Sequence, residues 1–280
     1  MTTKPHNARA SDLSKTDSAD PAPDHIDDIP PPLPLIRKLD SNAPLIWLRK
    51  GWEDLLATRF KGVFYGGVFV LMGYAIVLIY ATKWQLTMGL IGGFFLMGPF
   101  LCTGLYDLSR QQQLHGKASL LTSLTCWRRN VGSIAFFAIV ITFAMIVWAR
   151  VSIILFALAS TTNFPTLQGV LQMIFSLDNP QFVLIWCGVG LVFASIVFAI
   201  GVIAVPMMLD RRCDTFMAVF SSVRSVHANP RAMYFWAALV VIIIGMSLAA
   251  GFIPLLITAP IIGHATWHAY RDLVEPEPTV

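Results

Sequence analysis

The chain has 280 residues, of which 56% are hydrophobic and 13% are charged, and its mean hydropathy is +0.66. A soluble domain has about a quarter of its residues charged and slightly under half apolar, so this composition excludes an ordinary soluble globular protein. The net charge of +4 does not indicate nucleic-acid binding, because the basic residues flank long apolar runs, where anionic lipid head groups lie. We therefore expect a lipid bilayer, including its anionic head groups, as the partner of this chain, and no nucleic acid.

Residues 1–43 differ in composition from the rest of the chain. They contain seven Asp residues and a proline-rich run from Pro30 to Pro34. Such a segment is predicted to be disordered, and the proline run serves either as a spacer or as a polyproline II segment that docks a partner. We expect no cleaved secretion signal, because the first long apolar run begins only at Val63.

Six long apolar runs follow in order. Runs of about 18 or more apolar residues are typical of membrane-spanning helices. The sequence therefore predicts an all-α membrane protein with six transmembrane helices, and a tight turn at Gly251 and Pro254 separates the last two. The six runs are Val63–Ala81, Leu86–Tyr106, Ser133–Leu158, Phe182–Met208, Ala232–Ala250 and Phe252–Ala269.

The distribution of Lys and Arg predicts the orientation of these spans. Thirteen basic residues lie on one set of flanks, whereas the opposite set contains only Lys83. Cytoplasmic loops carry an excess of Lys and Arg, so both termini are predicted to be cytoplasmic. The thirteen are Arg49, Lys50, Arg59, Lys61, Arg110, Lys117, Arg128, Arg129, Arg211, Arg212, Arg224, Arg231 and Arg271.

A short amphipathic pattern recurs before the first, third and fifth spans. Its apolar residues are spaced four and then three apart, which places them on one stripe of a helix. With basic residues beside it, such a stripe predicts a helix that lies in the membrane interface, although it also suits a helix that caps the cytoplasmic end of the bundle. The three stripes are Leu48, Trp52 and Leu55; Leu120, Leu124 and Trp127; and Val219, Val223 and Val226.

This repetition divides residues 44–274 into three tandem units, each an interfacial helix followed by a two-span hairpin. The units cover about 44–112, 116–213 and 214–274, and a short tail follows at 275–280. Gly132 and Pro230 are expected to break the chain between the interfacial helix and the span. The middle unit has a long outer connection, in which Leu167–Phe175 predicts a short amphipathic helix. The second span of each unit contains a proline: Pro99, Pro206 and Pro260.

The charged ends of the second spans are expected to pair with the interfacial helices of neighbouring units. These ends are Asp107 with Arg110, Asp210 with Arg211, and Arg271 with Asp272. Exposed pairs of this kind contribute up to about 1 kcal/mol each, so their predicted role is structural.

Several motifs between Trp47 and Val274 resemble those of one protein family. They are Gly51-Trp52, Gly98-Pro99, Gly104-Leu105-Tyr106-Asp107-Leu108-Ser109-Arg110, Trp127-Arg128-Arg129-Asn130, Val147-Trp148-Ala149-Arg150, Pro206-Met207-Met208-Leu209-Asp210-Arg211 and Gly263-His264-Ala265-Thr266-Trp267-His268-Ala269-Tyr270-Arg271-Asp272. On these residues the chain resembles a family of bacterial predicted integral membrane proteins of unknown function. The resemblance implies a shared fold and an inner-membrane location, but no activity. Some members are labelled cytochrome c oxidase subunit I, which would require six haem- and copper-binding histidines at spacings that this sequence lacks.

Arg150 is the clearest charged residue inside a predicted span. It lies about 17 residues into the third span, roughly 25 Å along the helix. Charged side chains within spans are costly and are therefore functional candidates. Arg150 either extends to outer head groups, forms an ion pair with Asp178 of the outer connection, or takes part in a binding or transport pathway.

His264 and His268 are the second candidates, because residues four apart share one helical face. Two imidazoles at that spacing can ligate one metal or flank a haem. No carboxylate, Cys or third His follows at ligand spacing, so a metal site here is a speculative hypothesis and we assign no cofactor. Alternatively, both histidines form a belt at the cytoplasmic interface with Trp267 and Tyr270.

No motif in the sequence predicts an enzyme. It contains no Gly-rich phosphate loop, no nucleophile elbow, no His-Glu-x-x-His and no paired carboxylates within the spans. The leading interpretation is a non-enzymatic membrane protein that acts by binding, as an accessory or assembly factor of a larger membrane complex. The alternatives are a small transporter or channel, and metal or haem handling through the two histidines.

Overall fold

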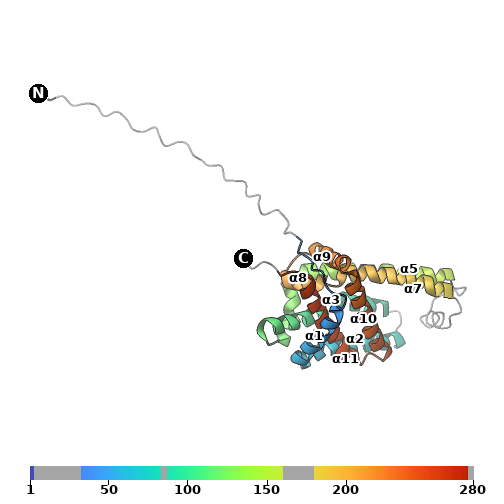
Figure 1. Cartoon of the computed structure of the whole chain (residues 1–280). Helices are drawn as coiled ribbons and strands as arrows, with labels where there is room; N and C mark the ends of the chain where they lie inside the picture. The colour runs from blue at the N-terminus through green and yellow to red at the C-terminus, as the bar shows by residue number, and fades with distance from the viewer. Residues whose placement is uncertain (3–32, 83–86, 160–179, 277–280) are drawn as a thin grey trace. The chain divides into compact units, whose positions relative to one another are not determined.

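A computed structural model of the chain describes residues 1–2, 33–82, 87–159 and 180–276 (Figure 1). From Pro34 onward the described elements are helices, together with one isolated antiparallel bridge. In chain order they are α1 (Ala43–Thr58), α2 (Phe60–Thr82), α3 (Thr87–His115), α4 (Leu120–Thr125), the 3-10 helix η2 (Cys126–Asn130), α5 (Val131–Ala159), α7 (Pro180–Gly201), α8 (Ala204–Arg211), α9 (Thr215–Ala228), α10 (Pro230–Ala249) and α11 (Leu255–Leu273).

The all-α membrane class is confirmed, and the count of spans differs from the prediction. Four segments among the described residues are long and apolar enough to cross a membrane: Phe60–Ile79, Leu120–Leu158, Pro180–Arg211 and Pro230–Ala249. Their most apolar windows are only 17–22% buried inside the protein, which leaves most of their side chains free to contact lipid. The second and sixth predicted spans form α3 and α11, which are helices but do not count among these four.

The fourth predicted span is broken into α7 and α8. Its chain leaves the helical path between Gly201 and Ala204, three residues before the ring of Pro206. A proline within a helix removes one backbone donor and clashes with the carbonyl of the preceding turn, so it favours a break at this place. Pro99 and Pro260, by contrast, lie inside continuous helices.

Of the two breaks predicted between an interfacial helix and the span after it, the one at Pro230 has the expected form. Pro230 occupies the first turn of α10, and Asn229 before it is non-helical. At the α1–α2 corner Arg59 adopts a positive φ of 49°. The prediction of a break at Gly132 is wrong: the chain passes from η2 directly into α5, and Gly132 lies within that helix. The tighter 3-10 turn of η2, rather than the glycine, makes this corner.

The core forms where α11 lies against α1, α2 and α3. Gly51 of α1 is in close contact with the α11 backbone, because an added Cβ would lie 2.6 Å from the carbonyl oxygen of Ile261. Glycine is needed at such a position since any side chain would push the two helices apart. From Gly263 to Tyr270 every residue of α11 is buried, so this helix is covered by protein rather than by lipid.

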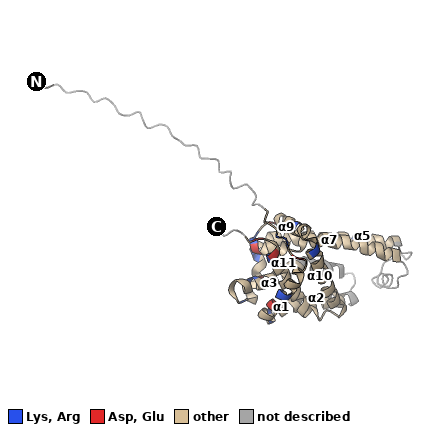
Figure 2. Ribbon diagram, viewed as in Figure 1, with Lys and Arg blue, Asp and Glu red and all other residues tan. Residues whose placement is uncertain are grey.

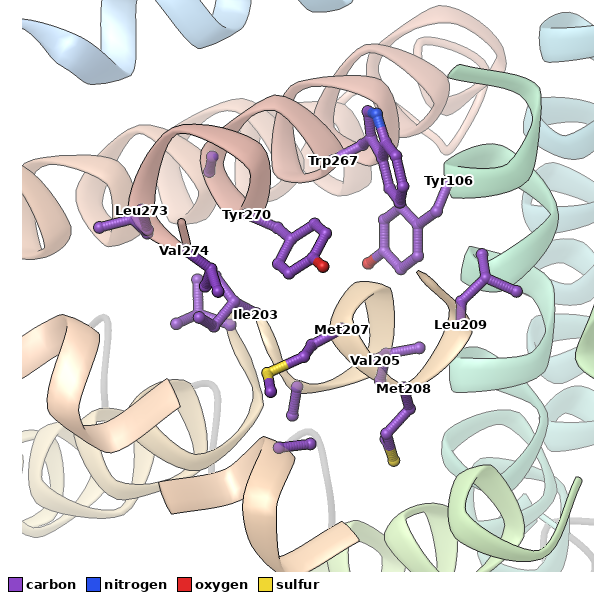
Figure 3. Packing of buried hydrophobic residues seen from close by; sticks show 14 of the residues in the cluster. Tyr106, Ile203, Val205, Met207, Met208, Leu209, Trp267, Tyr270, Leu273 and Val274 are labelled. Carbon is purple, nitrogen blue, oxygen red and sulfur yellow. The ribbon is translucent and has the colours of Figure 1, made fainter. Parts of the chain in front are cut away.

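Helix α8 is the second central element. All residues from Val202 to Leu209 are buried, and Met207 and Met208 are completely inaccessible. Figure 3 shows these side chains between Tyr106 of α3 and Trp267 and Tyr270 of α11. Unbranched methionine side chains suit such an irregular space between three helices.

The two ends of the helical body are joined to each other. Ile36 pairs with Val274 in an antiparallel bridge, and the amide of Arg37 donates to the carbonyl of Leu273 at 2.8 Å. The side chain of Asn229 fixes the same segment, donating to the carbonyl of Arg37 and accepting from the amide of Leu39. These residues belong to the stretch that the sequence analysis assigns to the tail, and they connect it to the end of α11.

The three predicted interfacial helices are present as α1, α4 with η2, and α9, and each has a buried and an exposed apolar face. In α1 Leu55 is buried, whereas Trp52 is 46% exposed and Trp47 is the fully buried tryptophan. The packed face of α1 thus carries Trp47, Gly51 and Asp54, each one residue before a member of the predicted stripe, which is a rotation of about 100° around the helix axis. Leu56 extends the exposed face.

The other two interfacial helices follow the same division. Leu124 of α4 is exposed, while Trp127 of η2 is partly buried with its ring edge-on to Phe100 at 5.9 Å. In α9 Val226 is buried and Val223 is exposed. One face of each helix thus covers the bundle and the other remains apolar and uncovered, as both interpretations of these stripes require.

Some predicted features lie outside the described residues. They are most of the acidic tail, the outer helix at Leu167–Phe175, Lys83 and Asp178.

Candidate functional site: a buried polar network between α1, α3 and α11

A chain of polar side chains lies where α11 meets α1 and α3, and it is buried except at Gln113, its exposed end. It comprises Asp54 of α1, Ser109 and Gln113 of α3, and His264, Trp267 and His268 of α11. Ser109 and His264 are fully buried, and Asp54 and His268 are 9% and 7% exposed. Buried polar groups are costly unless they are hydrogen-bonded, so the bonds within this chain hold the three helices in register.

The donor and the acceptor of each hydrogen bond in the network can be assigned from the groups at its two ends, the Trp267 indole and the Asp54 carboxylate. The Trp267 indole can only donate, and it donates to Gln113 Oε1 at 2.9 Å. The Gln113 amide nitrogen therefore faces His268 Nδ1, at 3.2 Å, and this ring nitrogen must accept. The other ring nitrogen of His268, Nε2, donates to Asp54 Oδ2 at 2.9 Å.

The second branch begins at the same carboxylate oxygen. Ser109 Oγ donates its single hydrogen to Asp54 Oδ2 at 2.6 Å, so it must accept from His264 Nδ1, which lies 2.7 Å away. His264 is then the Nδ1–H tautomer. Its other nitrogen, Nε2, is buried and has no hydrogen-bond partner among the described residues.

Asp54 is the anion on which both branches converge. Burial alone would raise the pKa of its carboxyl group, but the hydrogen bonds from His268 and Ser109 outweigh burial, and the pKa of Asp54 is lowered. The carboxylate is therefore ionised at neutral pH, which is why it acts as an acceptor in both bonds.

The presence of a serine, a histidine and an aspartate does not make this a catalytic triad. In a triad the histidine lies between the other two and takes the proton of the serine. Here Ser109 lies between His264 and Asp54, its proton points to the carboxylate, and the hydroxyl is inaccessible. The arrangement does not activate Ser109 as a nucleophile.

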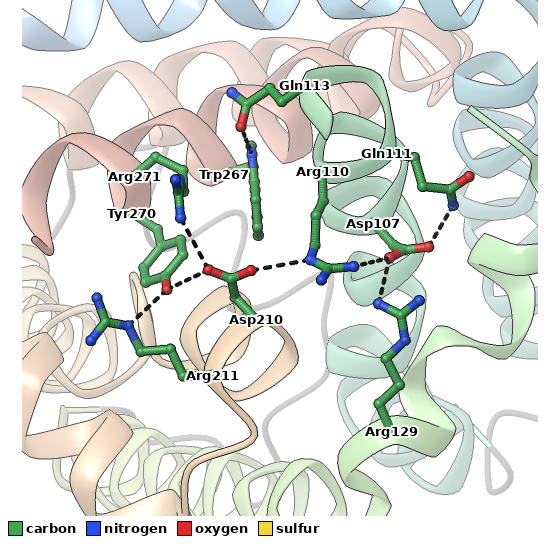
Figure 4. A network of polar contacts seen from close by, with 10 residues as sticks. All are labelled: Asp107, Arg110, Gln111, Gln113, Arg129, Asp210, Arg211, Trp267, Tyr270 and Arg271. Atoms are coloured by element: carbon green, nitrogen blue, oxygen red, sulfur yellow. Dashed lines mark hydrogen bonds and ion pairs between the residues drawn. The ribbon is translucent and has the colours of Figure 1, made fainter. Parts of the chain in front are cut away.

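A second network joins the ends of α3, α8 and α11 (Figure 4). Asp107 is fully buried and accepts from Arg110, Arg129 and Gln111. Figure 2 shows that acidic and basic residues gather beside α11 in this part of the body. Arg129 comes from η2, so the prediction that this end pairs with a neighbouring interfacial helix is confirmed for Asp107.

The other two helix ends differ from each other. Asp272 accepts from Trp47 at 2.9 Å and pairs with Lys50 at 3.6 Å, both from α1, as predicted. Asp210 instead accepts from Arg110, Tyr270 and Arg271, which belong to α3 and α11. The prediction is wrong for Asp210 because α8 lies at the centre of the body, where its end meets the other two helix ends rather than α9.

Arg150 lies on the exposed surface of α5, away from both networks. Its proposed partner Asp178 is outside the described residues, so the ion pair stays a prediction. Helices α5 and α7 lie side by side (Figure 1), joined by Trp148, whose ring lies 5.7 Å from that of Trp186, and by a hydrogen bond from Trp186 to Ser152. An exposed position does not favour the transport interpretation, which requires Arg150 to line an enclosed cavity.

The two histidines are brought together, but not around a common point. His264 Nδ1 and His268 Nε2 each bond to a different side chain, and the described residues contain no group of three or more His, Cys, Asp or Glu suited to a metal ion. The metal site stays a prediction. The alternative of an interfacial belt is wrong, because both histidines, Trp267 and Tyr270 are buried among helices.

Three residues of the network, Asp54, Ser109 and Gln113, were not predicted as site residues from the sequence. A usable signal was present in α1, where Asp54 shares a helical face with Trp47 and Gly51, at spacings of four and three. A carboxylate on the packed face of an amphipathic helix requires a buried partner, and the histidines of α11 were already candidates for it.

Comparison with known proteins gives one match. A family described as predicted integral membrane protein, DUF2189, matches residues 86–210. This stretch of the chain belongs to that family. It runs from α3 to α8 and confirms the resemblance for the motifs around Tyr106, Trp127 and Pro206, whereas Gly51 and the α11 motif lie outside it. No curated protein and no solved structure matches the chain.

Proposed function

We propose that this protein is a multi-pass protein of a bacterial inner membrane that acts by binding, as an accessory or assembly factor of a larger membrane complex. The observation that carries the proposal is that the buried carboxylates of both networks are occupied by other side chains of the same networks. The two buried carboxylates, Asp54 and Asp107, accept from five side chains of this same protein. Groups engaged in this way hold helices together and are not free for chemistry on a substrate.

The large exposed apolar surface of the hairpin α5–α7 supports a binding role. Nine of its large apolar residues are more than half exposed: Ile139, Phe143, Ile146, Ile154, Leu158, Leu184, Leu191, Val192 and Ile196. The hairpin contacts the rest of the body through α3, α8, α9 and η2. Its remaining surface faces the bilayer, where a helix of another membrane protein can pack.

The proposal includes six crossings, built as three tandem units with both termini in the cytoplasm. The order of a short helix followed by two long ones supports the repeat, with α1 to α3, α4 to α8, and α9 to α11 as the units. The excess of Lys and Arg on one set of flanks supports the orientation. The exposed apolar faces of α1 and α9 support an interfacial position for these helices, with their basic residues among anionic head groups.

Site-directed photocrosslinking in native membranes tests the binding role. A photoreactive amino acid at Leu191 of α7 is compared with one at Val241 of α10, which is equally exposed at 69% and 68%. We expect discrete protein adducts from Leu191 and not from Val241, because the hairpin extends two adjacent apolar helices away from the α11 core. Adducts with lipid alone at both positions would contradict the proposal.

A further inference from the structure

His264 Nε2 is a vacant proton acceptor in an otherwise complete network. The hydrogen bonds of His268 and Ser109 both point toward Asp54, so the cluster holds one buried negative charge beside the His264 imidazole. An ionised carboxylate buried beside an unprotonated imidazole nitrogen is a place where an added proton would reduce the buried charge.

The packing around Nε2 opposes that proton. The nearest part of α2 is Gly62, at which an added Cβ would lie 3.2 Å from Nε2 and 3.1 Å from Thr58 Oγ1. Thr58 already uses its hydroxyl hydrogen on the carbonyl of Asp54, 2.8 Å away. A protonated Nε2 would need an acceptor, and Thr58 Oγ1 or water can serve only if α11 moves relative to α1 and α2, since an unsatisfied buried donor costs about 1–3 kcal/mol.

We propose that His264 Nε2 is a proton-binding site whose occupation loosens the packing of α11 against α1 and α2. The titratable groups that act on this imidazole are Asp54 of α1 and His268 of its own helix. From α2 and α3 it faces Gly62 and Ser109, which do not titrate between pH 5 and 8. The proton comes from solvent as α11 loosens, and no other bond is made or broken.

The direction in which pH shifts the packing of α11 follows from the linkage between proton binding at His264 and that packing. An unpacked imidazole takes up a proton near pH 6.5, whereas the packed one lacks an acceptor for it. The packed state is therefore favoured above about pH 6.5. Below that pH the equilibrium shifts toward the loosened state by about tenfold for each pH unit.

The test uses the full chain in lipid nanodiscs. The readout is the equilibrium between packed and loosened α11, measured from the protection of its backbone amides against hydrogen exchange and corrected for the intrinsic effect of pH. His264→Asn keeps an amide nitrogen near the Nδ1 position for Ser109 and removes Nε2. The control is His227→Asn, which changes an exposed histidine of α9.

We expect the wild-type protein and the His227→Asn variant to lose about fivefold in protection from pH 6.5 to pH 5.5, and His264→Asn to lose none. His268→Gln retains a donor for Asp54 and is expected to behave as wild type. Equal loss in His264→Asn and wild type would overturn the proposal, as would loss that disappears only in His268→Gln.

A measurement on the wild-type protein does not depend on whether a variant folds. Nitrogen-15 chemical shifts of labelled histidines distinguish a protonated from a bare ring nitrogen. We expect Nε2 of His264 to be bare at pH 7.5, and to gain its proton in the same pH range in which α11 loses protection. A proton already on Nε2 at pH 7.5 would overturn the proposal.

Discussion

Substituting alanine for Gly66 of α2 tests the packing of α11 most sharply. An added Cβ at Gly66 would lie 2.1 Å from the backbone carbonyl oxygen of Leu256, far inside the 3.4 Å at which ordinary contact begins. Because the obstacle is backbone, no side-chain rotation relieves it, and α2 and α11 must separate by about 1.3 Å. Overpacking of this kind costs typically 1–3 kcal/mol, and we expect the upper end of that range.

The adjacent Gly67 provides a matched control on the same helix. Its added Cβ would lie 3.8 Å from a methyl group of Leu256, an ordinary contact. Both variants gain about 1 kcal/mol of helix propensity from the Gly-to-Ala change, so the difference between them isolates the steric cost. Gly66→Ala is expected to lower the free energy of unfolding by about 2 kcal/mol, while Gly67→Ala leaves it unchanged or raises it.

The assay is reversible unfolding of the purified protein from mixed micelles by increasing denaturing detergent, followed by tryptophan fluorescence. Trp47, Trp236 and Trp267 are fully buried and report on the region that includes α11. Equal stability of the two variants would show that α11 does not lie against Gly66, and would refute the argument that this helix is enclosed by α1, α2 and α3.

Three further changes test the polar contacts. Asp107→Asn removes a buried carboxylate that holds two arginines, and should lower the free energy of unfolding by about 2 kcal/mol in the same assay. Asn229→Ala removes the hydrogen bonds that hold the segment before α1 at Arg37 and Leu39, so trypsin should cleave faster at the exposed Lys38. The control is Asn42→Ala, which removes no capping bond and should not change the rate of cleavage. Because the pKa of Asp54 is lowered, its carboxylate stabilises the fold above its unfolded pKa of about 3.9, and this stabilisation is lost as the pH falls further. In Asp54→Asn the free energy of unfolding should therefore fall less steeply with pH below pH 4 than in the wild-type protein.

Much of the fold follows from hydropathy and helix-breaking residues. The turn between the last two helices lies where Gly251 and Pro254 predict it, with Gly251 at a φ of +83° that favours glycine. All six apolar runs form helices, because uninterrupted apolar residues in lipid satisfy their backbone groups only within a helix or a closed barrel. Hydropathy alone did not indicate that α11 is covered by other helices, since lipid and protein interiors are equally apolar.

The arrangement of side chains was harder to predict for a physical reason. The apolar stripe of α1 is wide enough to include both Trp47 and Trp52, and its pattern does not say which part faces protein and which faces lipid. The pairing of Asp210 depends on α8 being central, which no local pattern reveals. Asp54 was not predicted because a single carboxylate among charged neighbours resembles a solvated residue. Only its position on the same helical face as Trp47 and Gly51 indicates that it is buried.

The most direct test of the account is the sidedness of the two ends of the chain. The bridge between Ile36 and Val274 requires both ends to lie on the same side of the membrane, and the distribution of Lys and Arg predicts the cytoplasmic side. Single cysteines introduced at Leu35 and Glu275 in a cysteine-free version should both resist a membrane-impermeant maleimide in intact cells and react after the membrane is opened. Labelling of one position but not the other in intact cells would contradict both the strand bridge and the membrane topology.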